Sequence, residues 1–172
     1  MARETAEDLA KLQRLLDASY EAAGAHLRSI ITPERRLDAA STAELLEGMT
    51  LLSLATVTRD GRPLVCPVDG LFYRGEYWFS SATNSLRFVH IRERPHLSAT
   101  HLPSEAYQVT VHGRAVIAGS GDDLPAGLRE ICSELYGEWW SEFASTSLYA
   151  RIEADRMFTF YLAPGEAGAD GD

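Results

Sequence analysis

The sequence predicts a mainly β protein with helices, built on an antiparallel, barrel-like sheet of six or seven strands. From residue 51 onward apolar residues alternate with polar ones or form continuous runs, which is typical of strands. Turn signals such as Asp60-Gly61 separate these runs and indicate hairpins. No regular alternation of strands and helices is visible, which argues against a parallel sheet. The 172 residues suit a single domain with one core.

Two helices are expected ahead of the sheet. Between residues 6 and 31 apolar side chains recur every three or four positions, which predicts one amphipathic helix that ends at Thr32-Pro33. A second, shorter helix should begin at Ser41 or Thr42 as its N-cap. Residues 1–50 are therefore interpreted as an N-terminal helical extension.

The first two strands should form a hairpin. The first begins at Leu51, and the turn at 58–63 leads to a return strand at 64–73. Pro67 has no amide donor, which places it at a sheet edge or at a bulge. Gly113 is a plausible bulge in the fifth strand. The third, fourth and fifth strands are expected at 76–81, 96–102 and 107–119.

The last third of the chain is expected to add a helix and two strands. Apolar residues from Leu124 to Leu135 predict a helix that ends near Gly137, followed by an aromatic loop at 139–143. Two short strands are expected at 148–152 and 157–162. The barrel domain is placed at 51–163, and the acidic, glycine-rich residues 164–172 are interpreted as a disordered tail.

Charge and composition exclude several classes of function. The net charge of −9 repels a polyanion, so we expect no nucleic-acid partner. No window approaches the ~20 apolar residues that span a bilayer, and the charged N-terminal residues show no secretory signal, so we expect no membrane partner and a cytoplasmic location. Cys66 and Cys132 lack metal-ligand spacing, so neither a zinc site nor a disulfide framework is expected.

Small hydrogen-bonding side chains collect in FSSATNSLRF at 79–88, where the third strand passes into a helix expected at 84–93. The free amides of the first helical turn should face the same volume as the serines. Together with the guanidinium of Arg87, they suit one phosphate group. The alternative is that Thr83 or Asn84 only caps the helix and that the serines face water.

The order of these motifs resembles the split-barrel flavin-binding family related to pyridoxamine 5′-phosphate oxidase. The resemblance covers residues 43–118 and, more loosely, 148–162. It rests on the combination of AELLEGMTLLSLATVTRDGRPLVCPV, GEYWFSSATNSLRFVHIRERPHLSAT and VTVHGRAVI. It implies a split β-barrel that forms a homodimer, with two flavin molecules in grooves between the subunits.

The resemblance also implies a set of cofactor-binding residues. The cofactor phosphate should be met by Ser80 or Ser81, Thr83, Ser85 and Arg87, the last standing where many members have lysine. Arg62 resembles a second basic contact, and Pro67 and Val68 sit where backbone atoms approach the edge of the ring system. Gln108 either contacts the cofactor or packs across the dimer. Trp139 and Trp140 either close over the ring from the partner subunit or serve as core or dimer contacts.

FMN is the expected cofactor, and an 8-hydroxy-5-deazaflavin coenzyme is the alternative. The longer anionic tail of the deazaflavin would require further basic residues, for which Arg59, Arg92 and Arg94 are candidates. A pyridoxamine phosphate oxidase would be expected to end in a segment with arginine and histidine, whereas this chain ends in APGEAGADGD. Vitamin B6 chemistry is therefore not expected.

The sequence thus predicts a flavin-dependent oxidoreductase that acts on an unidentified small organic substrate. A deazaflavin-dependent reductase of the same fold is one alternative. A non-catalytic flavin- or haem-binding module and an empty barrel that serves as a dimeric interaction protein are the others. No catalytic acid or base is identified, because histidines on strands and helices are more often structural or exposed. The histidines considered are His90, His96, His101 and His112.

Overall fold

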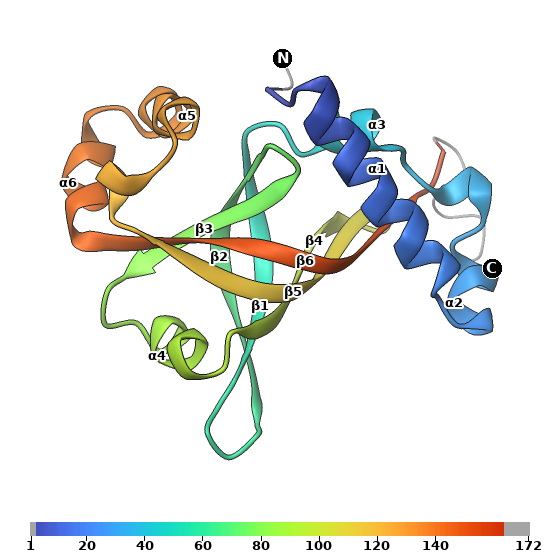
Figure 1. Ribbon diagram of the computed structural model, residues 1–172, viewed down its shortest axis with the longest axis horizontal. Coiled ribbons are helices and arrows are strands. Elements are labelled where there is room, and N and C mark those ends of the chain that lie inside the picture. Colours follow the sequence, from blue (N-terminus) through green and yellow to red (C-terminus); the bar gives the residue numbers. More distant parts are fainter. Residues whose placement is uncertain (1–2, 164–172) are drawn as a thin grey trace.

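A computed structural model describes residues 3–163, and within that range six antiparallel strands and six helices are found. The strands close into a barrel in the order β1-β2-β3-β6-β5-β4 (Figure 1). They are β1 (Met49–Val57), β2 (Pro63–Tyr73), β3 (Glu76–Ala82), β4 (His96–Ser104), β5 (Tyr107–Gly119) and β6 (Ser147–Tyr161). The helices are α1 (Ala6–Glu21), α2 (Ala25–Ile30), α3 (Ala39–Leu45), α4 (Leu86–Glu93), α5 (Ala126–Tyr136) and α6 (Glu138–Thr146). The predicted antiparallel barrel with helices ahead of it is confirmed.

Helix α1 lies against the barrel and shares its core (Figure 1). Leu12, Leu16 and Tyr20 are buried on its inner face, as its spacing predicts. The hydroxyl of Tyr20 donates to the carbonyl of Thr159 at 2.7 Å and accepts from the amide of Thr159 at 2.8 Å. Both polar groups are buried, and each satisfies the other.

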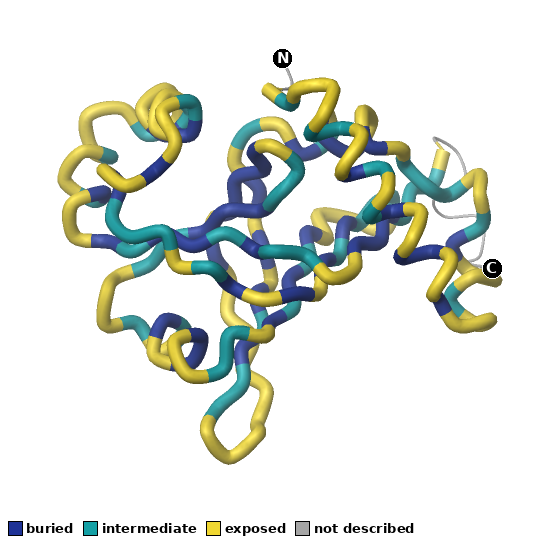
Figure 2. Tube along the Cα trace, viewed as in Figure 1, coloured by how far each residue is buried: buried dark blue, intermediate teal, exposed yellow. Residues whose placement is uncertain are grey.

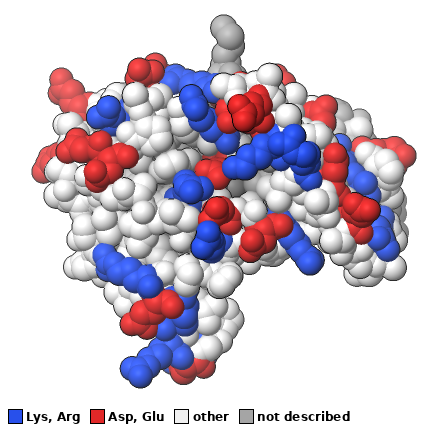
Figure 3. Space-filling view, in the orientation of Figure 1, with Lys and Arg blue, Asp and Glu red and all other residues white. Residues whose placement is uncertain are grey.

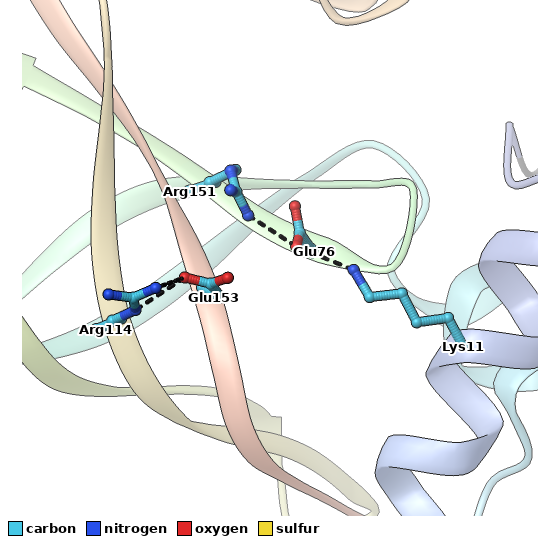
Figure 4. A network of polar contacts seen from close by, with 5 residues as sticks. All are labelled: Lys11, Glu76, Arg114, Arg151 and Glu153. Carbon is cyan, nitrogen blue, oxygen red and sulfur yellow. Dashed lines mark hydrogen bonds and ion pairs between the residues drawn. The ribbon is translucent and has the colours of Figure 1, made fainter.

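One ion pair joins α1 to the barrel, and others next to it join strands of the barrel (Figure 4). Lys11 Nζ of α1 lies 3.5 Å from Glu76 Oε1 at the start of β3, and the same oxygen lies 2.9 Å from Arg151 Nη1 of β6. Nearby, Arg114 of β5 pairs with Glu153 of β6 at 2.6 Å. These side chains are partly exposed, so each pair stabilises the fold by no more than about 1 kcal/mol.

Two predictions about the N-terminal helices are wrong in detail. The single helix expected over 6–31 is two helices, because α1 ends at Glu21 and α2 begins after Gly24. Glycine is unfavourable inside a helix, and here it stands at the N-cap of α2. Helix α3 begins earlier than expected, because Asp38 is its N-cap and accepts a hydrogen bond from the amide of Ser41 at 2.8 Å.

The β1–β2 hairpin projects from the barrel and is exposed at its tip (Figures 1 and 2). Gly61 has φ +83° in the turn, which confirms the turn predicted from Asp60-Gly61. Strand β2 pairs with β1 from Pro63 to Leu71, but it pairs with β3 only from Gly70 onward. Residues 63–69 therefore have one free edge, and the prediction that Pro67 lies at a sheet edge is confirmed.

The last third of the chain differs from the prediction in two ways. Strand β6 is continuous over 147–161, so the prediction of two short strands is wrong. The acidic residues thought to separate them are accommodated in the strand, where Glu153 lies opposite Arg114. The prediction of an aromatic loop is also wrong, because residues 138–146 form α6. The register between β5 and β6 shifts at His112/Gly113, but the extra residue, Asp155, stands on β6, so the bulge lies opposite Gly113 and not in the fifth strand as predicted.

The barrel has a main core inside and a smaller one outside. The outer core lies between β2, β3, β6 and the two helices α5 and α6, which we call the cap (residues 126–146). Leu71, Trp78 and Tyr149 face the cap from the barrel, and Leu128 and Cys132 meet them from α5. Figure 1 shows the cap and α4 at the same end of the barrel, near the end of β3.

Acidic and basic side chains are mixed over most of the face that Figure 3 shows. Within residues 3–163, no helix is long and apolar enough to cross a membrane. The predicted disordered tail, 164–172, lies outside the described residues.

Candidate functional site

The turn between β3 and α4 presents several hydrogen-bond donors in one place. Ser85 is the N-cap of α4, so the prediction that Thr83 or Asn84 caps this helix is wrong. The Ser85 amide donates to the carbonyl of Ala82 at 3.0 Å, but its side chain makes no capping bond. Among the described residues, the buried Ser85 hydroxyl has no hydrogen-bond partner. The first-turn amides of α4 also lack acceptors within the helix.

Arg87 connects this turn to the free edge of β2. Its Nη1 donates to Ser81 Oγ at 2.8 Å, and its Nη2 donates to the carbonyl of Pro67 at 3.1 Å. These two contacts fix the guanidinium beside the N-terminus of α4. A guanidinium has five N–H donors, so donors remain for a further acceptor. Arg87 is therefore preorganised to bind an anion.

A cleft of about 210 Å³ lies between the β1–β2 hairpin and α4. Ser81, Ser85 and Arg87 line it together with Cys66 and His90. Its donors converge on a volume that suits one phosphate group, so these residues fit the anionic end of a flavin nucleotide. His90 is buried, and its Nδ1 lies 2.9 Å from Thr56 Oγ1, which indicates a structural role.

A second pocket of about 250 Å³ lies between the outer face of the barrel and the cap. Ser81 and Arg87 line both this pocket and the cleft, so the two spaces meet at Arg87. The cap pocket is mainly aromatic. Its rings belong to Trp78, Phe79, Tyr136, Trp139, Trp140, Phe143 and Tyr149, and its polar groups to Asp69, Ser80, Ser81 and Arg87 with the two tyrosines.

A hydrogen bond connects the cap with β6. The indole N–H of Trp140 donates to the hydroxyl of Tyr149 at 2.9 Å, and Tyr149 lies opposite Ser80 of β3 in the sheet. Burial raises the pKa of Tyr149. Burial also raises the pKa of Tyr136 to about 12, with a smaller contribution from the negative charge of Asp69. Both phenols are therefore neutral donors at physiological pH.

Six of the nine predicted cofactor-binding residues lie around these two spaces. Ser81, Ser85 and Arg87 line the cleft, and the carbonyl of Pro67 is held by Arg87. Val68 and Ser80 line the cap pocket.

The structure does not bring the other three into this site within one chain. Arg62 lies at the exposed hairpin turn and pairs with Asp60 at 2.8 Å. The side chain of Thr83 is exposed, and its carbonyl accepts from Arg92 Nη2 at 3.2 Å. Gln108 lies opposite Phe160 on β6, whereas Ser81 lies opposite Leu148. The twelve steps along the chain from 148 to 160 correspond to about 40 Å of strand, so Gln108 and Ser81 lie far apart.

The sequence analysis missed several residues that line the cap pocket, above all Asp69, Tyr136 and Tyr149. Asp69 is a charged residue inside an apolar strand, which was one available signal. A second signal was the spacing of Trp139 and Phe143, which places two rings on one face of a helix. These two rings are stacked, with centroids 4.9 Å apart and planes at 18°.

The closed antiparallel barrel with a free edge at β2 defines this molecule as a split-barrel protein. A family model described as pyridoxamine 5′-phosphate oxidase matches residues 39–161, and the chain belongs to this family. No curated protein matches the chain.

Several solved structures share the fold. A conserved hypothetical protein from Mycobacterium tuberculosis is 20% identical with a TM-score of 0.61, covering 76% of this chain and 88% of that chain. An F420 reductase is 16% identical with a TM-score of 0.52, covering 66% of this chain and 93% of that chain. A haem storage protein from Vibrio cholerae is 17% identical with a TM-score of 0.53, covering 65% of this chain and 85% of that chain. At these identities the likeness establishes the fold alone.

Proposed function

We propose that this protein is a flavin-dependent oxidoreductase that binds FMN and acts on a small organic substrate. The observation that carries the proposal is the position of Arg87, fixed by Ser81 and Pro67 beside the N-terminus of α4. A guanidinium, a buried hydroxyl without a partner and free helix amides form a binding site for a single phosphate. Membership of the pyridoxamine 5′-phosphate oxidase family supports the cofactor class.

Each residue of the cleft has a separate part in holding FMN. Arg87 and the first-turn amides of α4 neutralise the phosphate, and Ser85 Oγ donates its free proton to a phosphate oxygen. The backbone of Pro67 and Val68 borders the ring system, because this part of β2 has no strand paired on its other edge. Bound FMN would supply the redox chemistry, while these residues orient it and limit its contact with water.

A homodimer belongs to the proposal. The outer face of β1, β2 and β4 exposes Leu51, Val65 and Leu102, each between 59% and 64% accessible. Apolar side chains exposed on adjoining strands are typical of an interaction surface, and a second copy of this chain would bury them. Sedimentation equilibrium should therefore give twice the mass of one chain, and a monomer with bound FMN would contradict this part of the proposal.

A deazaflavin cofactor is the second candidate, favoured by the structural likeness to an F420 reductase, since F420 is an 8-hydroxy-5-deazaflavin. Its longer tail would require basic side chains beyond Arg87. Arg92 is exposed on α4, where it could contact such a tail. Arg94 is already engaged, because it donates to the carbonyl of Val57 at 3.0 Å and pairs with Glu93. FMN needs only the single phosphate site, so we place it first.

The proposal is tested by replacing Arg87 with alanine and titrating the protein with FMN and with riboflavin. Loss of one charge-assisted contact should weaken FMN binding about tenfold to a hundredfold. Riboflavin lacks the phosphate, so its affinity should change little. Arg62→Ala is the matched control, because Arg62 is exposed and paired only at the hairpin turn.

Equal losses for FMN and riboflavin, or no loss for either while the variant remains folded, would contradict the phosphate site. The visible spectrum of the purified protein distinguishes flavin from haem. Turnover with NAD(P)H or with reduced deazaflavin then distinguishes an enzyme from a binding module, which the likeness to a haem storage protein makes the main alternative.

A further inference from the structure

The cap pocket is a separate space from the cleft that would hold the phosphate. It lies on the outer face of β2, β3 and β6, and the cap helices of the same chain form its other wall. It meets the cleft only at Ser81 and Arg87. Val68, which borders the ring system in the proposed function, also lines the cap pocket, so a ligand there would lie directly against the cofactor ring.

The rings of the cap are arranged to contact a flat molecule. Trp139 lines the pocket and remains 60% exposed, although Phe143 stacks on it at 4.9 Å. Tyr136 adds a tilted contact to Trp139 at 6.2 Å. An indole supported by two rings and still exposed is typical of an aromatic anchor that a ligand completes.

The cap is tied to the barrel beside these rings. Trp140 is half-buried, and its indole N–H donates to the hydroxyl of Tyr149 on β6 at 2.9 Å. This hydrogen bond, which involves no ligand, restrains the distance between Trp140 and the barrel. Such a pocket needs little rearrangement on binding, which favours a rigid planar ligand over a flexible one.

Size and charge narrow the ligand further. A volume of about 250 Å³ is slightly below the ~300–1,000 Å³ of pockets for drug-sized ligands, so it suits one or two fused rings. Asp69 places a carboxylate in the wall, which disfavours an anion. Arg87 lines both spaces, and in the proposed function the phosphate in the cleft neutralises its charge.

We infer that the cap pocket binds a planar aromatic compound of one or two rings that carries no net negative charge. That this compound is the substrate of the redox reaction, and that Arg87 is neutralised so that anions are disfavoured, rests on the proposed function, but the binding of a planar aromatic compound does not. The inference also gives Trp139 and Trp140 a place within their own subunit, as walls of a ligand pocket.

The test uses calorimetry on the full chain with 2-naphthamide, its saturated analogue decahydro-2-naphthamide and 2-naphthoate. We expect 2-naphthamide to bind about tenfold more tightly than the saturated amide, because only the flat ring can stack. With FMN bound at Arg87, 2-naphthoate should bind several-fold more weakly than the amide, and Asp69→Asn should reduce that difference.

Trp139→Ala should weaken 2-naphthamide binding about tenfold without lowering the melting temperature, since this ring is mostly exposed. Leu135→Ala is the matched control on the same cap, because Leu135 is exposed and lines a different pocket. Equal affinity for the flat and saturated amides, or unchanged affinity in folded Trp139→Ala, would overturn the inference.

Saturation with FMN separates the two proposals. If FMN and 2-naphthamide bind together, both sites stand. If FMN displaces 2-naphthamide, the cap pocket belongs to the flavin ring and the inference fails, while the proposed function survives. If 2-naphthamide binds and no flavin does, the proposed function fails and the aromatic pocket stands.

Discussion

Helix α1 and the cap both pack against the barrel and leave spaces of similar volume, but the space beside α1, about 230 Å³, is lined largely by charged side chains such as Lys11 and Glu76. Leu12 and Leu16 of α1 are almost completely buried, and the hydroxyl of Tyr20 is satisfied by Thr159. The cap buries Leu128 and Cys132 but leaves about 250 Å³ between its aromatic rings and the barrel. The core that α1 shares with the barrel is densely packed and gives stability, whereas the aromatic lining under the cap gives a place for a planar ligand.

The largest expected effect follows from breaking the packed side. Leu16→Ala removes a fully buried side chain from the core shared by α1 and the barrel. The free energy of unfolding should fall by about 2 to 5 kcal/mol, measured by urea denaturation. Trp139→Ala removes a larger side chain from the cap, but it should change the free energy of unfolding by less than about 1 kcal/mol. Similar losses in both variants would show that the cap is packed as completely as α1.

A second effect should appear in alkaline solution. Burial raises the pKa of the Cys132 thiol to about 11, above its ordinary value near 9. Between these values the unfolded chain releases the thiol proton and the folded chain keeps it, so rising pH favours unfolding. Stability present below pH 9 should therefore be lost toward pH 11, by up to about 2 kcal/mol.

Urea denaturation at pH 7, 9 and 10.5 measures this loss. In Cys132→Ala, the free energy of unfolding should fall less steeply with pH over the same range, even though the variant is less stable at every pH. If wild type and Cys132→Ala lose stability in parallel between pH 9 and 11, the thiol is not the responsible group.

The smallest effect concerns the hydrogen bond that holds the cap. Trp140→Phe keeps the ring but removes the N–H that donates to Tyr149 at 2.9 Å. The loss should be about 0.5 to 1.5 kcal/mol of stability. Because that bond lowers the pKa of Tyr149 against the effect of burial, the variant should also ionise this phenol at higher pH in a spectrophotometric titration. An unchanged titration would show that the bond does not form in solution.

Local signals were sufficient to predict most of the barrel. The turn at Asp60-Gly61 and the edge position of Pro67 each depend on the backbone chemistry of one or two residues. The errors occur where tertiary contacts outweigh local preference. Glu153 lies within a continuous strand because β6 pairs with β5 along most of its length, with Arg114 opposite Glu153, and its sequence neighbours do not reveal this pairing.

The candidate site shows the same division. Ser81, Ser85 and Arg87 are close in sequence, and the strand-to-helix turn brings them together as the motif indicates. Arg62 is close to Pro67 in sequence, but it lies at the far end of a projecting hairpin. The cap pocket was not predicted, because it depends on how α5 and α6 fold back over β2, β3 and β6.

The free edge of β2 also bears on self-association between sheets. An unpaired strand edge offers amides and carbonyls to any other strand, and such pairing leads to aggregation. At Pro67 this edge has no amide to offer, and the carbonyl of Pro67 is already taken by Arg87. The same arginine that would neutralise a phosphate thus also blocks the growth of intermolecular β-structure, so its removal should make the protein more prone to form fibrils.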